Sequence, residues 1–383
     1  MNGQDDGRGA KLAEVLAAGA TALGRRLAEP EVLREGDWTT VLRCTDEAGP
    51  GTVIIKAYPP GPAGESCFAA EAAGLALAGR TGLAPVLLAA SQHSLTVVMS
   101  DLGRAPSLAD LLLGTDRERA AGGLLDWADA CGRLAVALAG RQSELARLRR
   151  AHAGGSPSGG SPGAAPGRDM EQRVLSVAER AALVGVTAPT GLAAELTEVA
   201  AEFSRQACPV FSPGDICPDN SLLTPTGVQL IDFEDSGFHS VFLDAAYLRM
   251  PFSTCWCTFR LPAGLRGAAE ERYRAQVARI WPDLTDDLSW ERGVRRAVAA
   301  WSLNSMWWLL GRALAGDAPL ESGVVAAPRA RQLMRHRWQV LAEELEADGG
   351  LPTIGAMARE LLAATMSWHA EDLPLYPALG LPS

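Results

Sequence analysis

Residues 210–223, VFSPGDICPDNSLL, and residues 228–238, VQLIDFEDSGF, decide the fold of this chain. Each segment sets oxygen-bearing side chains in a short loop beside an apolar run: Asp215 and Asn220 in the first, Asp232 in the second. A carboxylate or an amide is expensive to bury unless it is hydrogen-bonded or bound to something. The residues that join the loops predict an intervening β-hairpin. The sequence therefore predicts a binding site built from these two loops.

The composition is that of a folded globular protein. Of the 383 residues, 48% are hydrophobic and 21% are charged, which argues against a disordered chain. The length has room for two or three ordinary domains, or for one two-lobed enzyme with a large core. The formal net charge of -10 argues against nucleic acid as a main partner, because a phosphate backbone requires a basic face. Acidity also fits a cationic substrate, although it serves solubility as well.

The N-terminal stretch and the cysteines bear on the cellular compartment. The stretch MNGQDDGRGAKLAEV is polar and acidic, unlike a signal peptide. No apolar run is long enough to span a bilayer, so we expect a cytoplasmic protein without a membrane partner. The seven cysteines are scattered, which disfavours a disulfide framework. Cys255 and Cys257 are a candidate metal pair, but no second pair or histidine cluster accompanies them in the sequence, so buried reduced thiols are the favoured interpretation.

Lysine is rare in this sequence, and one of its two occurrences lies in a predicted strand. Among the 35 basic residues only Lys11 and Lys56 are lysines. Lys56 ends the apolar run of GTVIIKAY, which we expect to pair with TTVLRCT across the turn-forming DEAGPG. Downstream, ESCFAAEAAGLALAGR has helical spacing and places Glu71 on a helix. We therefore expect a compact ammonium to be required at Lys56, the alternative being a surface lysine retained by chance.

Further elements follow in the N-terminal third and in the middle of the chain. LTVVMSDLG predicts a strand that runs into a short connector, and SLADLLL predicts a capped helix after it. Residues 118–150 have a helical pattern. Residues 152–168 form a Gly/Ser/Pro tract that cannot bury a core. We interpret this tract as a flexible surface insertion rather than a linker between independent domains.

These features together resemble a known family. A strand lysine, a helix glutamate, a strand ending in MSDLG, then GDICPDN and LIDFE occur in the order typical of aminoglycoside phosphotransferases, a branch of the protein-kinase-like superfamily. The resemblance implies an α+β, two-lobed protein-kinase-like fold, with a small antiparallel β N-lobe that has one helix and a large, mainly helical C-lobe. It also implies three regions: an N-terminal helical segment (1–31), a nucleotide-binding N-lobe (32–102), and a C-lobe (103–383) with the catalytic loop, the metal loop and the acceptor site.

The same resemblance implies a role for each group. The chain would transfer the γ-phosphoryl group of ATP, with GTP as an alternative, to an acceptor hydroxyl in the presence of Mg²⁺. Asp215 would be the catalytic base, Asn220 and Asp232 would hold the metal ion, and Asp219 would be a solvated turn residue rather than a ligand. The nucleotide contacts would come from Lys56, held by Glu71, and from the connector that receives the adenine, Met99, Ser100, Asp101 and Leu102.

The chain departs from the family pattern in the catalytic loop. Pro213 stands where these proteins usually have a histidine that braces the metal-binding loop. The groups expected to contact substrate remain, so we expect an active enzyme, with a non-catalytic pseudokinase as the alternative. Asp244 is expected to be a structural acid that braces the catalytic loop, and His239 a hydrogen-bonded loop residue. The Gly-rich loop of protein kinases is absent, which argues against a eukaryotic-type protein kinase.

The acceptor is open between two classes. The first is a small-molecule hydroxyl, on an aminoglycoside or another natural product. The second is a Ser or Thr of a ribosomal precursor peptide, phosphorylated beside a lyase partner that eliminates the phosphate. The tryptophans of WERGVRRAVAAWSLNSMWWLLGRALAG are expected to pack in the C-lobe core, and the proline-rich SWHAEDLPLYPALGLPS is expected to lie along the surface.

Overall fold

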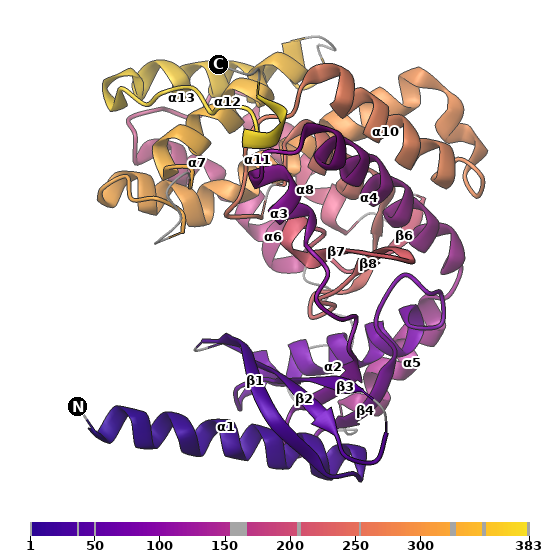
Figure 1. Cartoon of the computed structure of the whole chain (residues 1–383). Helices are drawn as coiled ribbons and strands as arrows, with labels where there is room; N and C mark the ends of the chain where they lie inside the picture. Colours follow the sequence, from indigo (N-terminus) through magenta and orange to yellow (C-terminus); the bar gives the residue numbers. More distant parts are fainter. Residues whose placement is uncertain are drawn as a thin grey trace.

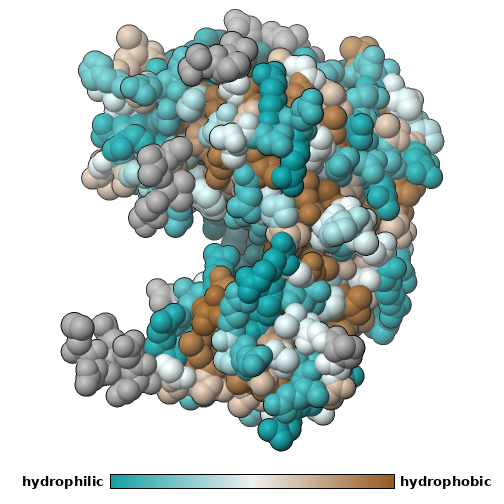
Figure 2. All heavy atoms as spheres, viewed as in Figure 1, coloured by the Kyte–Doolittle hydropathy of each residue, from teal (hydrophilic) through white to brown (hydrophobic). Residues whose placement is uncertain are grey.

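The chain folds into two lobes of different composition. The N-terminal lobe is built around a β-sheet, and the larger C-terminal lobe is mainly helical (Figure 1). An open notch separates the lobes on the face shown in Figure 2. The computed structural model describes residues 2–36, 38–49, 51–153, 167–204, 208–252, 254–321, 327–346 and 350–380.

A five-stranded antiparallel sheet forms the N-terminal lobe, in the order β1-β2-β3-β5-β4. Strands β2 and β3 form the predicted hairpin, in which Leu42 lies opposite Ile55. The sequence alternates apolar and polar residues here because one face of each strand is more deeply buried than the other. The strands are β1 (Leu27–Glu35), β2 (Thr40–Asp46), β3 (Thr52–Ala57), β4 (Leu87–Ser91) and β5 (Thr96–Ser100).

Two helices cover the opposite faces of this sheet. Helix α1 (Asn2–Leu23) packs on the face that carries Ile55 and Val98, and lies on the side away from the C-terminal lobe (Figure 1). Helix α2 (Pro62–Ala78) packs on the other face, within the main core. Because successive side chains of a strand point to opposite faces, Lys56 faces α2 when Ile55 faces α1.

The C-terminal lobe is a helical assembly around a core rich in tryptophan. Trp127, Trp290 and Trp338 are fully buried, and Trp301 is buried with its Nε1 donating to the carbonyl oxygen of Leu243 over 2.9 Å. Core packing is therefore confirmed for Trp290 and Trp301 of the predicted segment, whereas Trp307 and Trp308 are only half-buried. The helices are α3 (Leu108–Leu113), α4 (Arg117–Ala137), α5 (Gln142–His152), α6 (Gly167–Leu175), α7 (Val177–Ala182), α8 (Leu192–Ala200), α9 (Val241–Arg249), α10 (Ala263–Val277), α11 (Asp287–Ala315), α12 (Ala330–Glu346) and α13 (Pro352–Ala364).

A buried arginine ties four of these helices together. Arg249, at the end of α9, donates to Glu270 on α10 through two nitrogens, over 2.6 and 2.9 Å. It also bonds Glu291 on α11 over 2.7 Å and Glu344 on α12 over 3.2 Å. Burial alone would lower the pKa of this guanidinium. Its hydrogen bonds to Glu270 and Glu291, together with the nearby negative charges, raise that pKa instead. This cluster fixes α9, the helix that follows the two acidic loops.

Two small two-stranded sheets carry those loops. Strand β6 (Pro209–Ser212) pairs with β9 (Gly237–Ser240), and β7 (Ser221–Thr224) pairs with β8 (Gly227–Leu230). The second pair is the hairpin expected between the loops. The chain thus leaves β6 into one loop and returns to β9 from the other, so that both loops lie between the same two small sheets.

The C-terminal segment runs along the surface of the helical lobe, as expected, but several of its apolar side chains are buried in the core. Leu373, Tyr376 and Leu379 are each 2% exposed or less, and Tyr376 Oη donates to the carbonyl oxygen of Cys257 over 2.8 Å. Prolines prevent a long helix in this segment, as expected. They do not prevent an irregular segment from burying its apolar side chains.

Other expectations concern the ends of elements. Helix α1 ends at Leu23, so β1 begins within the segment 1–31 that was expected to be helical. The expected insertion, 152–168, falls between α5 and α6, and its residues 154–166 lie outside the described residues. Within the described part of the chain, no helix has both the length and the apolar character needed to cross a membrane.

Candidate active site

The two small sheets bring the predicted acidic loops into contact. The backbone N–H of Ile231 donates to the carbonyl oxygen of Asn220 over 2.9 Å, which places Asn220 beside Asp232. Asn220 Nδ2 in turn donates to the carbonyl oxygen of Asp215 over 3.2 Å. Asp215, Asn220 and Asp232 therefore form one site, although they lie on separate loops.

Gly214 is required for the close approach of these loops. Its φ is +94°, in the left-handed region that disfavours residues with a side chain. A Cβ at this position would lie 2.4 Å from the carbonyl oxygen of Asp235. The glycine next to Asp215 thus lets the two loops touch through their backbones.

Lys56 links the two lobes at this site. Its Nζ lies 3.2 Å from Glu71 Oε2, as the family resemblance implied, and Tyr58 Oη donates to the same oxygen over 3.3 Å. From the C-terminal lobe, Asp232 Oδ1 lies 2.5 Å and Glu234 Oε2 lies 3.1 Å from Lys56 Nζ. One ammonium thus bonds a helix of the first lobe and a loop of the second.

The electrostatics keep Lys56 charged. Burial alone would lower the pKa of Lys56, but the charges of Glu71, Asp232 and Glu234 outweigh it and raise that pKa. Burial raises the pKa of Glu71, which is 1% exposed, and the charge of Lys56 opposes that rise. A buried ammonium among carboxylates is therefore available to bind a polyanion.

Asp232 and Asn220 suit a hard cation. Asp232 has a φ of +66°, which is uncommon for a residue other than glycine and typical of functional sites. Among the described residues, the side-chain contacts run through Asp232 Oδ1 and Asn220 Nδ2, which leaves Asp232 Oδ2 and the amide oxygen of Asn220 without a hydrogen-bond donor. Mg²⁺ prefers oxygen ligands of this kind, so the donor set fits that ion.

Asp215 is held by a residue that the motifs did not indicate. Thr254, in the segment after α9, donates from Oγ1 to Asp215 Oδ1 over 2.6 Å. Burial raises the pKa of the Asp215 carboxyl, and the hydrogen bonds from Cys217 and Thr254 partly offset that rise. A carboxylate with a raised pKa and one oriented oxygen is suited to accept a proton.

A buried network supports the strand that leads into the catalytic loop. Asp244 is 4% exposed, and its Oδ1 accepts hydrogen bonds from Ser212 Oγ over 3.0 Å and contacts His239 Nε2 at 2.8 Å. Ser212 Oγ also accepts from the backbone N–H of Gly214 over 3.2 Å. The contacts agree with the expected bracing role of Asp244. His239 is hydrogen-bonded as expected, but it lies on strand β9 rather than in a loop.

The connector expected to receive the adenine begins at the end of β5. Met99 and Ser100 belong to that strand, and Leu102 follows it in the chain leading to α3. Asp101 is engaged within the N-terminal lobe: its carboxylate bonds Arg43 at 2.7 Å and accepts from Thr52 Oγ1 over 2.5 Å. Any contact of Asp101 with a purine base would therefore use its backbone, and the adenine assignment stays a prediction.

Sequence reasoning missed three contacts of this site. Glu234 could have been suspected from its place in LIDFE, and it also accepts a hydrogen bond from Trp38 Nε1 over 3.2 Å. Thr254 carried no motif. Asp219 lies in a short turn, as expected, but it is only half-exposed and its Oδ2 accepts from Trp256 Nε1 over 3.0 Å. Its interpretation as a merely solvated residue was therefore wrong.

The fold and this site define a class of protein. A sheet lobe whose lysine is held by a helix glutamate faces a helical lobe that carries two acidic loops, which is the arrangement of kinase-like phosphotransferases. The sequence profile of the phosphotransferase enzyme family matches residues 32–285, about two thirds of the chain. The chain therefore belongs to the phosphotransferase enzyme family and is an enzyme that transfers a phosphoryl group to a hydroxyl.

Solved structures share the fold at low identity. A choline/ethanolamine kinase family protein from Mesorhizobium loti is 19% identical, with 93% of this chain and 99% of that chain covered. A choline kinase from Cryptosporidium parvum is 14% identical, with 86% and 93% covered. A protein from Ralstonia eutropha, provisionally described as an aminoglycoside phosphotransferase, is 14% identical, with 92% and 98% covered. Each has a TM-score of 0.50, and no curated protein sequence matches this chain.

Proposed function

We propose that this chain transfers the γ-phosphoryl group of ATP to a hydroxyl of a small cationic molecule, such as an aminoglycoside or another natural product, with the help of Mg²⁺. The observation that carries the proposal is the contact of Lys56 with both Glu71 and Asp232. It joins the expected phosphate-binding group of one lobe to the expected metal ligand of the other. GTP remains an alternative donor, to be compared directly with ATP.

The nucleotide would bind at the junction of the lobes. Lys56 would contact its phosphates and Glu71 would hold the lysine in place, with the connector Met99–Leu102 against the base. In the structure Lys56 is bound to Asp232 and Glu234 as well as to Glu71. Nucleotide phosphates would compete for this ammonium, so we expect the contacts to the second lobe to rearrange on binding.

Asn220 and Asp232 would hold the magnesium ion. Bound there, Mg²⁺ would neutralise charge on the phosphate oxygens and orient the triphosphate. The backbone hydrogen bond between Ile231 and Asn220 keeps the two proposed ligands, Asn220 and Asp232, beside each other in one site. The left-handed backbone at Asp232 fixes the direction from which its carboxylate reaches that site.

Asp215 would be the catalytic base. The acceptor oxygen forms a bond to the γ-phosphorus, the bond from that phosphorus to the bridging oxygen of ADP breaks, and the hydroxyl proton passes to Asp215. Thr254 holds one carboxylate oxygen, which leaves the other to meet the acceptor. The raised pKa of Asp215 favours this proton transfer.

The charge of the chain supports a cationic acceptor. The similar structures are named for choline, ethanolamine or aminoglycoside phosphorylation, and all of these molecules join a hydroxyl to a positive charge. The chain carries a formal net charge of -10. Neither observation favours a precursor peptide with a lyase partner, so that acceptor is not part of the proposal.

The test is release of ADP in the presence of a panel of hydroxylated amines. Wild type should turn over at least one acceptor only with Mg²⁺, and Asp215→Asn should lower kcat by about 100-fold or more while ATP analogue still binds. Asp126→Asn, a matched change on an exposed part of α4, should leave turnover unchanged. Calorimetric titration should show binding that weakens in Asp232→Asn. Failure to bind either ATP or GTP would refute the proposal, and binding without turnover of any acceptor would favour a pseudokinase.

A further inference from the structure

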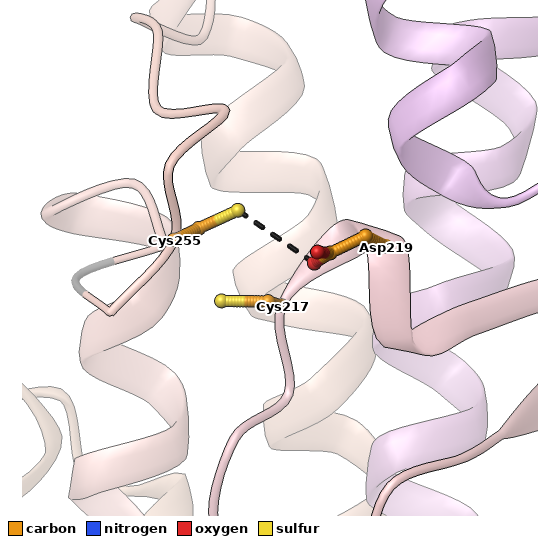
Figure 3. A group of neighbouring side chains, drawn as sticks. All are labelled: Cys217, Asp219 and Cys255. Atoms are coloured by element: carbon orange, nitrogen blue, oxygen red, sulfur yellow. Dashed lines mark hydrogen bonds between the residues drawn. The ribbon is translucent and has the colours of Figure 1, made fainter. Parts of the chain in front are cut away.

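Two cysteines and an aspartate converge beside the catalytic loop (Figure 3). Cys217 Sγ, Cys255 Sγ and a carboxylate oxygen of Asp219 all lie within 4.8 Å of one another. Cys217 and Asp219 follow Asp215 in the same loop, whereas Cys255 comes from the segment after α9. The two cysteines are 2% and 3% exposed. Donor atoms from two distant segments thus face one another in the protein interior.

The carboxylate of this cluster is already oriented. Trp256 Nε1 donates to Asp219 Oδ2 over 3.0 Å, and Cys255 Sγ lies 3.7 Å from Asp219 Oδ1. The tryptophan therefore holds one oxygen and leaves the other toward the sulfur (Figure 3). Carboxylates that bind metal ions are commonly oriented by an outer hydrogen bond of this kind.

We propose that Cys217, Asp219 and Cys255 bind a zinc ion. Zinc takes thiolate sulfur at about 2.3 Å and carboxylate oxygen at about 2.0–2.2 Å, so two sulfurs on one tetrahedral ion lie about 3.8 Å apart. The three donor atoms already lie within 4.8 Å of one another. Magnesium prefers oxygen ligands, so thiolates select against it. This zinc ion is therefore separate from the magnesium of the proposed reaction.

Cys257 is a neighbour of the site rather than a ligand. Its Sγ lies 2.7 Å from Cys255 Sγ, and the backbone N–H of Cys257 lies 3.3 Å from the same sulfur. Two sulfurs that close cannot both bind one ion at the tetrahedral separation of about 3.8 Å. The backbone N–H of Cys257 donates to Cys255 Sγ, and with zinc bound the Cys257 thiol would donate to the same sulfur. The fourth ligand position is left to a water molecule.

A buried cation offsets the charge of the site. Arg337 on α12 is fully buried; that burial lowers the pKa of its guanidinium, and negative charge on Cys217 and Cys255 raises it. Two thiolates and one carboxylate around Zn²⁺ carry one net negative charge, which the guanidinium balances. Burial raises the pKa of the Cys217 thiol, so zinc would have to displace its proton on binding.

Zinc at this position would fasten the catalytic loop to the segment after α9. Thr254 precedes Cys255 in that segment, and its Oγ1 contacts both Asp215 Oδ1 at 2.6 Å and Cys217 Sγ at 3.1 Å. The metal would therefore keep Thr254 against Asp215. This consequence for turnover rests on the proposed function, whereas the zinc site itself does not.

The test begins with the metal content of the intact chain. We expect about one zinc per chain by mass spectrometry of the metal after reducing purification and removal of any affinity tag. Cobalt added to the demetallated chain should give thiolate-to-cobalt charge-transfer absorption and tetrahedral visible bands. Neither readout depends on phosphoryl transfer, so failure of the zinc site and failure of the proposed enzyme are distinguished.

Matched variants assign the ligands. Cys217→Ala, Cys255→Ala and Asp219→Asn should each lose the stoichiometric zinc, and the cysteine variants should also weaken the charge-transfer band. Trp256→Phe should lower zinc affinity by about 10- to 100-fold, the effect typical of an outer hydrogen bond. Cys44→Ala, which removes a buried thiol in the N-terminal lobe, should retain the zinc.

The metal content of the wild-type chain tests the proposal even if the variants fail to fold. A wild-type protein that holds no zinc and gives no thiolate–cobalt absorption would overturn the proposal. An unreduced protein whose intact mass lacks two hydrogens at Cys217 and Cys255 would also overturn it, because a disulfide would then join the sulfurs. Zinc retained in both cysteine variants would place the ion elsewhere and exclude this site.

Discussion

Replacing Lys56 with methionine tests how the buried charges between the lobes are balanced. Methionine keeps most of the length of the side chain and removes its charge. Glu71 would then lose its cation while remaining 1% exposed, with the Tyr58 hydroxyl as its donor. Removing one partner of a buried ion pair typically costs about 3–5 kcal/mol. In Glu71→Gln, by contrast, Lys56 keeps Asp232 and Glu234, so we expect a loss of about 1 kcal/mol in the free energy of unfolding.

The loss in the methionine variant should also grow with pH. Burial raises the pKa of Glu71 and the charge of Lys56 lowers it, so removing the lysine raises the folded-state pKa further. A carboxyl whose folded-state pKa is raised contributes stability that is complete below its unfolded-state pKa and is lost as the pH rises through the folded-state value. The deficit of Lys56→Met relative to wild type should therefore be larger at about pH 9 than at about pH 5.

Urea unfolding followed by circular dichroism measures these free energies, and hydrogen exchange in α2 localises them. The double variant, in which Lys56→Met is combined with Glu71→Gln, is the control. It should regain a large part of the lost free energy of unfolding. Most of the added pH dependence should disappear, because no buried charge is left without a partner at position 71. The reasoning would be refuted if Lys56→Met were as stable as Glu71→Gln, or if its deficit shrank as the pH rose.

Other predictions concern the loops and the helical lobe. A Cβ at Gly214 would lie 2.4 Å from a carbonyl oxygen of the neighbouring loop, so Gly214→Ala should lower the free energy of unfolding by about 2–4 kcal/mol. Gly122→Ala, in open space on α4, should not lower it in the same urea titration. Arg249→Met should cost about 3–5 kcal/mol because three glutamates lose their shared partner; an unchanged melting temperature would contradict this. Thr254→Val should move the acid limb of the kcat–pH profile upward by about one unit, since a hydrogen bond that lowers the pKa of Asp215 is lost, and Thr254→Ser should leave it in place.

Local patterns predicted much of the fold. The alternating residues of GTVIIKAY and TTVLRCT correctly predicted β2 and β3, because a strand buried more deeply on one face imposes a period of two. SLADLLL correctly predicted a capped helix, and Ser107 forms a capping box with Asp110. The pair of Lys56 and Glu71 was implied by the family resemblance, and the structure brings the two side chains together. Each of these inferences involves residues that are near one another in the sequence.

Contacts between distant segments escaped prediction. The burial of Leu373, Tyr376 and Leu379 depends on contacts with distant segments, such as the carbonyl oxygen of Cys257, and proline content carries no information about those contacts. Thr254 reaches Asp215 from 39 residues away, and a lone threonine has no pattern to mark it. Cys217 was one of several scattered cysteines until the fold placed it beside Cys255.

By itself, the sequence determined the class of this protein: a strand lysine, a helix glutamate and two acidic loops in a given order, each set by local periodicity and turn chemistry. Only the tertiary structure decided that Lys56 bonds Asp232 and Glu234, that Thr254 holds Asp215, and that three donor atoms meet at Asp219. Hydrophobic burial drives the lobes and helices together without regard to these polar side chains. Their partners are therefore fixed by how the whole chain packs, which no short stretch of sequence records.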